Sequence, residues 1–260
     1  NSFTPSLTLT STSDETDHFI KEGSPYILTA KQVAMTGLPR YDHLLEARKR
    51  HMESKGKSAI LLLPTWRRYL TDAEINSADT ADSDSSSKTS AFVAGWQQLL
   101  DDARLCEIAR IYDLDIVLYP HPQAISLLKH EQLRLPQYIQ LGPPERQSFQ
   151  EYAAQASLCI TDYSSASVDI SLLGTPAIYY QFDEKEFYED ECGQESGFFE
   201  FERDGYGPVV STEEECLKAV ETIASQGFEM TPEYAERAAK AFTMADGHCC
   251  ERAYEAIVSL

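Results

Sequence analysis

Residues 158–181 read LCITDYSSASVDISLLGTPAIYYQ, and this stretch decides the fold. Apolar runs at 158–161 and 177–181 enclose a segment, 164–173, whose apolar residues recur at helical spacing. Short and almost wholly apolar strands that alternate with helices are typical of a parallel sheet covered on both faces. The stretch therefore predicts a βαβ unit, with the polar residues TDYSS at the carboxyl end of its first strand.

The same alternation extends outward from this unit. Strands are expected at 32–35, 59–63, 115–119 and 138–141, and helices at 43–54, 91–112, 123–130 and 146–156. Three further helices are expected to close the chain, at 213–225, 232–242 and 249–259. We therefore predict an α/β fold with a Rossmann-like, doubly wound parallel sheet over residues 31–260.

Two segments depart from the alternation. Residues 1–30 begin without methionine in a Ser- and Thr-rich stretch, so we expect a tail or the remnant of a preceding domain. Residues 71–90, TDAEINSADTADSDSSSKTS, are too poor in apolar side chains to fold by themselves. This acidic insertion is expected to be a flexible surface loop. It is either a flap over the neighbouring strand end or a plain disordered insertion.

Composition limits the function. The 260 residues, 42% of them hydrophobic, suffice for a substantial core. With 42 acidic and 22 basic residues the net charge is -20, which argues against nucleic acid or an anionic membrane surface as a partner. No apolar run approaches the roughly 20 residues that cross a bilayer, and no signal peptide is evident, so we expect a soluble chain. The cysteines lack zinc-site spacing, which is typical of reduced thiols in the cytoplasm.

Four polar motifs follow predicted strands. They are TGLPRYD at 36–42, PTWR at 64–67, YPHP at 119–122 and TDYSS at 161–165. In open parallel sheets, ligands bind beyond the carboxyl ends of the strands, where loops and helix N-termini converge. The motifs together predict one phosphate-handling site at one edge of the sheet.

The TDYSS turn consists of Thr161, Asp162, Tyr163, Ser164 and Ser165. Because it leads into a helix, it offers unpaired backbone N–H groups, a favourable helix dipole and two hydroxyls. These groups suit a diphosphate. An ordinary N-cap, in which the serines bind their own helix, would use the same residues.

His121 lies between Pro120 and Pro122, directly after an apolar run. The flanking prolines stiffen the backbone and are expected to direct the imidazole into the cleft. There it could neutralise phosphate charge or move a proton. The alternative is a structural histidine.

Arg67 and Thr65 follow the strand at 59–63. An arginine fork beside a hydroxyl suits bidentate contact with phosphate, and the alternative is a surface arginine that covers Trp66. Asp183, just past the last strand, either holds a ribose or acceptor hydroxyl or caps the segment that follows.

The TGLPRYD motif is interpreted as mainly structural. Gly37 and Pro39 are expected to shape a turn, and Arg40 and Asp42 either pair with each other or cap the next helix.

The sequence gives no support for a metal site or for a dinucleotide-binding or P-loop motif. Asp82-Ser83-Asp84 and Asp113-Leu114-Asp115 match the DxD pattern of many glycosyltransferases. The first lies in the acidic insertion, and the second lies at the amino end of a predicted strand, away from the site. We therefore expect no metal and no cofactor. The chain also lacks GxGxxG and GxxxxGK[ST].

Taken together, the motifs resemble the CDP-glycerol glycerophosphotransferase family, the teichoic-acid polymerases and their capsule-polymer relatives. The matching pieces are TGLPRYD, PTWR, the HP at 121–122, TDYSS with Asp169, YY-x-x-D at 179–183, GYGP at 205–208, and DGH at 246–248 with Arg252. The match runs from about residue 29 to the C-terminus. It implies a GT-B fold, of which this chain is the C-terminal, donor-binding half without the N-terminal domain.

The resemblance also implies a reaction. A polyol phosphate passes from CDP-glycerol or a related CDP-polyol to the end of a growing cell-surface polymer on a lipid carrier, and CMP is released without a metal. His121 is the implied catalytic residue of this half, and a second histidine, in the other half, is the implied base. The implied donor-binding residues are Thr65, Arg67, Pro120, Thr161, Asp162, Tyr163, Ser164, Ser165, Asp169 and Asp183.

On this interpretation the isolated chain binds donor without turnover. The full-length bacterial protein is expected in the cytoplasm, peripheral at the inner face of the plasma membrane. Two other functions use the same fold. One is a GT-B nucleotide-sugar glycosyltransferase or epimerase, which TDYSS and PTWR disfavour, and the other is a non-catalytic nucleotide-binding module.

Overall fold

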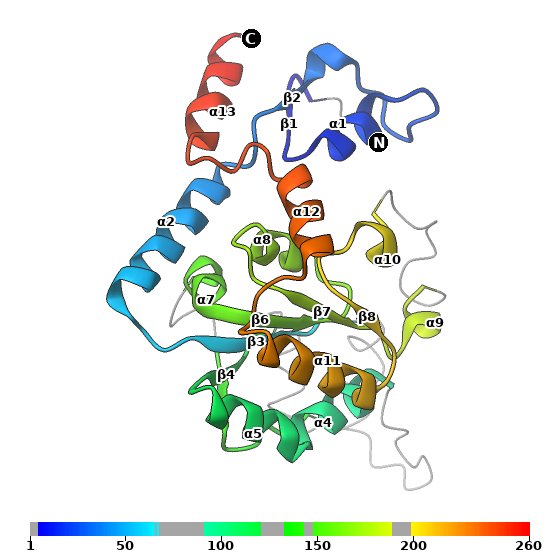
Figure 1. Ribbon diagram of the computed structural model, residues 1–260. Coiled ribbons are helices and arrows are strands. Elements are labelled where there is room, and N and C mark those ends of the chain that lie inside the picture. The colour runs from blue at the N-terminus through cyan, green and yellow to red at the C-terminus, as the bar shows by residue number, and fades with distance from the viewer. Residues whose placement is uncertain (1–4, 66, 68–90, 121–132, 143–147, 189–198) are drawn as a thin grey trace, which may run out of the picture.

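Figure 1 shows the computed structural model, which describes residues 5–65, 67, 91–120, 133–142, 148–188 and 199–260. Its main sheet has six strands in the order β5-β4-β3-β6-β7-β8, and every neighbouring pair is parallel. The strands are β3 (Ala59–Leu63), β4 (Asp115–Leu118), β5 (Ile139–Leu141), β6 (Ala156–Thr161), β7 (Ala177–Tyr180) and β8 (Val209–Val210). The predicted doubly wound, Rossmann-like sheet is confirmed.

Helices cover both faces of this sheet (Figure 1). One face packs against α4 (Ala91–Asp101), α5 (Ala103–Ile111) and α11 (Glu213–Ser225). The other packs against α2 (Arg40–Ser54), α7 (Phe149–Gln155) and α8 (Ala166–Ser171). Capping boxes at Ser148 and Thr212 begin α7 and α11, because each hydroxyl accepts an orphan backbone N–H and a glutamate three residues later binds back.

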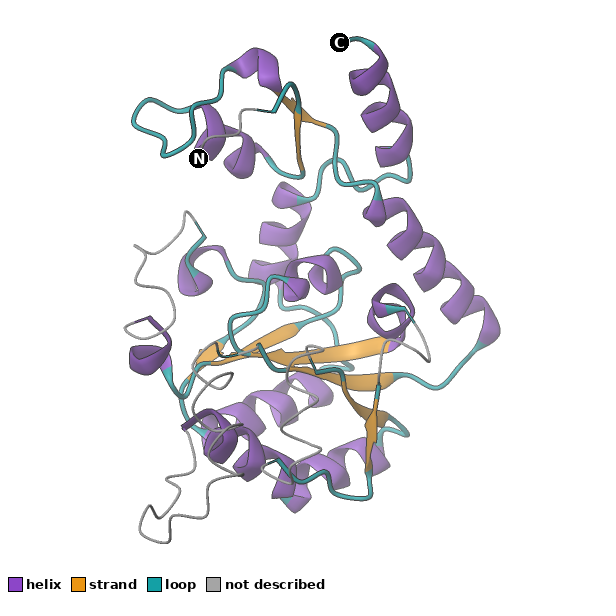
Figure 2. Cartoon of the chain, turned by 180° about the vertical axis from the view of Figure 1, so that it is seen from behind, coloured by secondary structure: helices purple, strands orange, loops and turns teal. Residues whose placement is uncertain are grey.

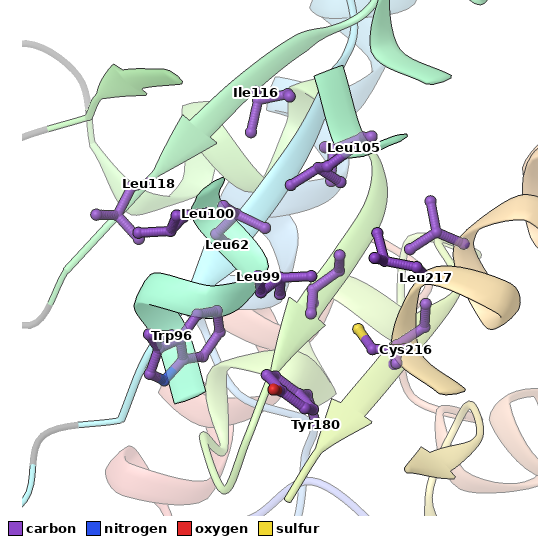
Figure 3. Close-up of a cluster of buried hydrophobic side chains, with 14 of the residues drawn as sticks. Leu62, Trp96, Leu99, Leu100, Leu105, Ile116, Leu118, Tyr180, Cys216 and Leu217 are labelled. Atoms are coloured by element: carbon purple, nitrogen blue, oxygen red, sulfur yellow. The ribbon is translucent and has the colours of Figure 1, made fainter. Parts of the chain in front are cut away.

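The larger core lies between the sheet and α4, α5 and α11 (Figure 3). Trp96, Leu99 and Leu217 are fully buried there against strand residues such as Leu62. Complete burial of one large apolar side chain contributes about 1.5–3 kcal/mol. The apolar runs that predicted the central strands, such as β3 and β7, are thus buried because helices cover them on both sides.

The predicted single helix at 91–112 is wrong, since the structure has α4 and α5 with a break at Asp102. The backbone of Asp102 is extended, and its carboxylate accepts a hydrogen bond of 2.7 Å from the backbone N–H of Arg104. Aspartate favours such an N-cap over a helix interior, so the second helix starts anew at this residue.

The N-terminal residues form a small unit of their own. It consists of β1 (Thr8–Thr10), α1 (Ser13–Ile20), the 3-10 helix η1 (Ala30–Gln32) and β2 (Val33–Met35). β1 and β2 pair in parallel in a separate two-stranded sheet. The strand expected at 32–35 therefore exists but does not join the main sheet, and the Ser- and Thr-rich stretch carries folded elements.

Two helices end the described chain, α12 (Pro232–Ala241) and α13 (Cys249–Val258). Figures 1 and 2 both place α13 at the same end of the molecule as the β1–β2 unit. The expectation that Asp42 pairs with Arg40 or caps its own helix is wrong. Asp42 accepts hydrogen bonds of 2.9 and 2.7 Å from the backbone N–H groups of Cys249 and Cys250, so it caps α13.

Arg252 on α13 strengthens this junction. Its Nε donates to the carbonyl of Thr36 at 2.9 Å, and its Nη1 pairs with Asp246 at 2.9 Å. The TGLPRYD and DGH motifs therefore join the start of α2 to the start of α13, which confirms a structural role for the first motif. Among the described residues, no helix is long and apolar enough to cross a membrane.

Candidate functional site

The candidate site lies where the strand order reverses, between β3 and β6. From β3 the sheet continues to β4 and β5 on one side, and from β6 to β7 and β8 on the other. Leu63 pairs with Thr161 at the adjacent carboxyl ends, so the PTWR and TDYSS motifs leave the sheet side by side. Such a reversal is where open α/β sheets bind ligands, which agrees with the predicted site.

Arg67 is the cation at the centre of this edge, and its side chain is 0% exposed. Its Nε and Nη2 donate to the two carboxylate oxygens of Asp183 at 3.0 and 2.9 Å. Nη2 also donates to Asp162 at 2.9 Å, and Nη1 donates to the carbonyl of Thr65 at 2.9 Å. The prediction that Arg67 contacts donor phosphate does not match this geometry, because the guanidinium is enclosed and already paired.

Asp162 joins the loops that follow β3 and β6. Its Oδ1 accepts from the backbone N–H groups of Thr65 and Tyr163, at 2.9 and 2.7 Å. Its Oδ2 accepts from Arg67 and, at 3.4 Å, from Nε1 of Trp96. Asp162 is fully buried, so its carboxylate holds the site together from inside and does not face a ligand.

Asp183 is the second carboxylate on Arg67, and it is 1% exposed. The two roles expected for it, a contact to a ligand hydroxyl or a cap for the following segment, are not what the structure has. It precedes α9 (Glu184–Glu186), but its side chain makes no capping hydrogen bond there. The ion pair with Arg67 occupies both carboxylate oxygens instead.

Three aromatic rings enclose the guanidinium of Arg67. Its Cζ lies 4.9, 5.0 and 4.8 Å from the ring centroids of Phe92, Tyr163 and Phe187. The rings of Tyr163 and Phe187 stack face to face, with centroids 3.7 Å apart and planes 4° apart. These aromatic side chains pack around the guanidinium and exclude water from the ion pairs, since the Arg67 side chain is fully buried.

Burial and pairing act in opposite directions on the charged groups. Burial alone would lower the pKa of Arg67, but Asp162 and Asp183 outweigh it, and the pKa lies above its usual value. Burial raises the pKa of Asp183 above 3.8, although Arg67 opposes this. The neighbouring carboxylate of Asp162 adds to the effect of burial and also raises the pKa of Asp183.

Hydroxyl groups line the same strand ends. Thr161 is buried, and its Oγ1 donates to the carbonyl of Leu63 at 2.6 Å. Ser164 is partly exposed and its Oγ accepts from the backbone N–H of Ala166, while Ser165 is exposed at the start of α8. In the described part of the chain, Thr65 Oγ1 and the hydroxyl of Tyr163 are buried without a hydrogen-bond partner.

Asp169 lies in α8 and is 6% exposed. Its two oxygens accept from Nε and Nη2 of Arg40, at 2.7 and 3.1 Å. Asp169 thus ties the start of α2 to α8, and its donor-binding role stays a prediction.

His121, the predicted catalytic residue, lies outside the described residues, as do Trp66 and the insertion at 71–90. Pro120 is described and buried directly after β4, at the same edge as the other motifs. The position of Pro120 therefore agrees with the prediction, and the position and function of His121 stay predictions.

The second DxD pattern is confirmed to lie away from the site. Asp115 begins β4 at its amino end, and Lys57 pairs with Asp115 and Asp113 at 2.9 and 3.3 Å. Across the residues that the structure describes, no group of three or more His, Cys, Asp or Glu side chains is arranged to hold a metal.

Sequence reasoning included Tyr163 but missed three other aromatic residues of the site, Phe92, Trp96 and Phe187. Phe92 and Trp96 lie four residues apart on α4, a spacing that reads as an ordinary core stripe. Phe187 follows Asp183 by four residues in a segment that resembles a polar turn. Only the nearness of these positions to predicted strand ends could have drawn attention to them.

A Rossmann-like domain with two motifs at its strand-order reversal defines a class of nucleotide-binding proteins, and comparison of the sequence identifies the family. The chain belongs to the CDP-Glycerol:Poly(glycerophosphate) glycerophosphotransferase family, whose model matches residues 6–259.

Individual relatives come from teichoic acid synthesis. The minor teichoic acid biosynthesis protein GgaB of Bacillus subtilis (strain 168) is 24% identical over 258 residues, which are 98% of this chain and 26% of GgaB. The teichoic acid poly(glycerol phosphate) polymerase of the same strain is 29% identical over 132 residues, 46% of this chain and 17% of that protein. The chain thus spans about a quarter or less of these relatives.

Solved structures show the same fold. The wall teichoic acid polymerase TagF superposes with a TM-score of 0.61 at 16% identity, covering 97% of this chain and 57% of TagF. A UDP-GlcNAc 2-epimerase of Methanocaldococcus jannaschii follows with a TM-score of 0.54 at 17% identity, covering 98% of this chain and 61% of the epimerase. These likenesses agree with the GT-B fold that the motifs implied.

Proposed function

We propose that this chain binds a CDP-activated polyol, such as CDP-glycerol, at the carboxyl edge of its main sheet. The polyol phosphate is then transferred to a hydroxyl of a growing cell-surface polymer. The observation that carries the proposal is that PTWR and TDYSS, two of the motifs in which the chain resembles the family, lie side by side at the strand-order reversal. The family model that matches residues 6–259 supports it. A structure of a TagF variant soaked with CDPG supports the choice of donor.

In the proposed reaction, an acceptor oxygen attacks the distal phosphorus of the donor diphosphate in line. The bond from that phosphorus to the bridging oxygen breaks, and CMP leaves with that oxygen. Transfer of this kind needs positioning and stabilisation of negative charge more than covalent catalysis. His121 and the hydroxyls of Ser164 and Ser165 are the groups proposed to face the diphosphate, and no metal is required.

The acceptor and the setting belong to the same proposal. The acceptor is a polymer on a lipid carrier at the inner face of the plasma membrane, and a second Rossmann-like domain supplies a base from the opposite side of the cleft. This chain covers 26% of GgaB and 57% of TagF. Transfer is therefore assayed on the full-length protein.

The donor is tested by calorimetry of the chain with CDP-glycerol, CDP-ribitol, UDP-glucose and UDP-N-acetylglucosamine. We expect binding of a CDP-polyol and at least about tenfold weaker binding of both UDP-sugars, a difference of about 1.4 kcal/mol. The same titration in a chelator is expected to give the same affinity. Preference for a UDP-sugar would refute the proposal.

The second candidate is a GT-B enzyme that acts on a nucleotide sugar. The fold likeness to UDP-GlcNAc 2-epimerases favours it. The titration above separates this candidate from the first. A third candidate, a non-catalytic binding module, is tested by release of CMP from CDP-glycerol by the full-length protein, since a module binds the donor and releases none.

A further inference from the structure

Three strand-end loops meet on a single buried cation. Arg67 follows β3, Asp162 follows β6 and Asp183 follows β7, and Arg67 pairs with both carboxylates at 2.9 Å. We propose that these three residues, here called the Arg67 clamp, are positioning residues that set the relative placement of the loops forming the donor site. This inference rests on the proposed function for its effect on the donor, and on geometry alone for its effect on the loops.

The clamp is closed to ligands. A guanidinium has five N–H donors, and four hydrogen bonds to Asp162, Asp183 and the carbonyl of Thr65 already engage all three nitrogens of Arg67. The Arg67 side chain is 0% exposed, and aromatic rings lie about it. Arg67 therefore acts on a bound donor only through the groups that it holds.

Those groups are backbone atoms at the strand ends. Asp162 accepts from the N–H groups of Thr65 and Tyr163, and the side-chain amide of Gln181 donates to the carbonyl of Asp162 at 3.2 Å. Peptide groups after β3 and β6 are thus fixed to one carboxylate, whose orientation depends on Arg67, and Gln181 after β7 binds the backbone carbonyl of the same aspartate. A change at Arg67 reaches Ser164 and Ser165 through this connection.

The Arg67 clamp is better suited to fixing the positions of the loops than to stabilising the folded chain. A buried ion pair gains little over apolar residues of the same volume, because the charges lose their hydration. A planar fork, in contrast, accepts carboxylates only in defined directions. Two carboxylates on one fork therefore fix the angle between their loops, which apolar contacts would leave adjustable.

The test compares Arg67→Lys with Arg48→Lys in the whole chain. Lysine keeps the positive charge but cannot bind two carboxylates in the geometry of a fork. Arg48 is a matched control, because it is partly buried and its Nη1 donates to the carbonyls of Ala154 and Ala156, at the amino end of β6. Both variants are expected to lower the thermal midpoint by comparable amounts.

Two readouts separate positioning from general destabilisation. In Arg67→Lys, hydrogen exchange of the Thr65 and Tyr163 amides is expected to rise about tenfold relative to Arg48→Lys, and CDP-glycerol affinity to fall about tenfold. A tenfold change corresponds to the loss of one hydrogen bond to a charged group. Exchange and affinity equal to those of the control would overturn the proposal.

The outcomes also separate this inference from the proposed function. If the wild-type chain binds no CDP-glycerol, the proposed function fails, and exchange at Thr65 and Tyr163 still decides whether the clamp holds the loops. If Arg67→Lys does not fold, Asp183→Asn replaces it, since this variant keeps the pair of Arg67 with Asp162. If amide exchange at Thr65 and Tyr163 and the affinity for CDP-glycerol are both unchanged in Asp183→Asn, the positioning role of the Arg67 clamp is wrong.

Discussion

The backbone N–H of Thr65 donates a hydrogen bond of 2.9 Å to Oδ1 of Asp162, which lies 97 residues further along the chain. This bond joins the PTWR and TDYSS motifs directly. Each motif alone is compatible with an ordinary turn, but together they form one connected edge at the strand-order reversal. The bond also explains why Asp162 is buried, since its carboxylate serves the protein backbone.

Gly207 tests the close packing of the GYGP motif. A Cβ atom built at Gly207 would lie 1.7 Å from the carbonyl oxygen of Ala177, so Gly207→Ala must displace β7 or β8. We expect a loss of at least about 3 kcal/mol in the free energy of unfolding, measured by urea denaturation. The control is Gly174→Ala, where φ is +77° and nothing lies within 4 Å. It should lose only about 1–2 kcal/mol from backbone strain. Equal losses would contradict the predicted clash.

Asp42 tests the cap of α13. Removal of this cap in Asp42→Ala should cost about 1–2 kcal/mol at pH 7, measured by urea denaturation. Asp42→Asn keeps one acceptor oxygen and should lose less. Similar stability of the wild type and Asp42→Ala at pH 7 would show that the cap contributes nothing.

The same residue gives a pH dependence. Burial alone would raise the pKa of Asp42, but the backbone N–H groups of Cys250 and Cys249 outweigh it and hold the pKa below 3.8. The unfolded chain therefore takes up a proton first as the pH falls, and the contribution of Asp42 is present above the unfolded value. The stability difference between the wild type and Asp42→Ala should shrink as the pH falls from 5 to about 3. A constant difference would refute this origin.

Asp183 gives the opposite sign. Burial raises its pKa above 3.8 in the folded protein, so the folded state binds a proton more readily than the unfolded chain. Its favourable contribution is complete below the unfolded pKa and is lost as the pH rises through the folded value. The wild type should therefore gain stability relative to Asp183→Asn as the pH falls from 7 toward 4. Urea denaturation of both proteins across this range measures it, and a gain of the variant would be inconsistent with the prediction.

His121 is tested in the full-length protein. If it neutralises charge or moves a proton at the diphosphate, His121→Ala should lower the rate of CMP release at least about 100-fold. The thermal midpoint should stay within the experimental error of the wild type. His43→Ala is the matched control, because His43 is exposed on α2, and it should keep the wild-type rate. A wild-type rate in His121→Ala would remove this residue from the proposed mechanism.

The sequence predicted most of the main sheet because burial on both faces requires apolar runs, and β3, β4, β6 and β7 lie in such runs. The edge strand β5 was also predicted, although its Gln140 is exposed. β8 was missed because Val209–Val210 is too short to give a pattern. The helix α1 was missed because its sequence, SDETDHFI, is polar. Its N-cap, Thr12, accepts from the N–H of Glu15, and this was the one local signal.

The location of the candidate site was predictable and the contacts within it were not. Strand ends are visible in the sequence, and parallel strands bring them to one edge. The role of Arg67 depends on which carboxylates the fold brings near, and these lie 95 and 116 residues away. A short motif holds no information on partners so far away in the sequence. The PTWR motif is therefore equally compatible with an arginine that contacts phosphate and with one that forms an internal ion pair.

The pairing of β3 with β6 also has a consequence for synthesis of the chain. These central strands are distant in sequence, and contacts of this kind form late because a long loop must close first. A nascent chain that has passed PTWR and TDYSS still lacks Asp183, the third member of the Arg67 clamp. The candidate site therefore cannot be complete until translation has passed residue 183 and β3, β6 and β7 have come together, so donor binding would report that these three strands have joined.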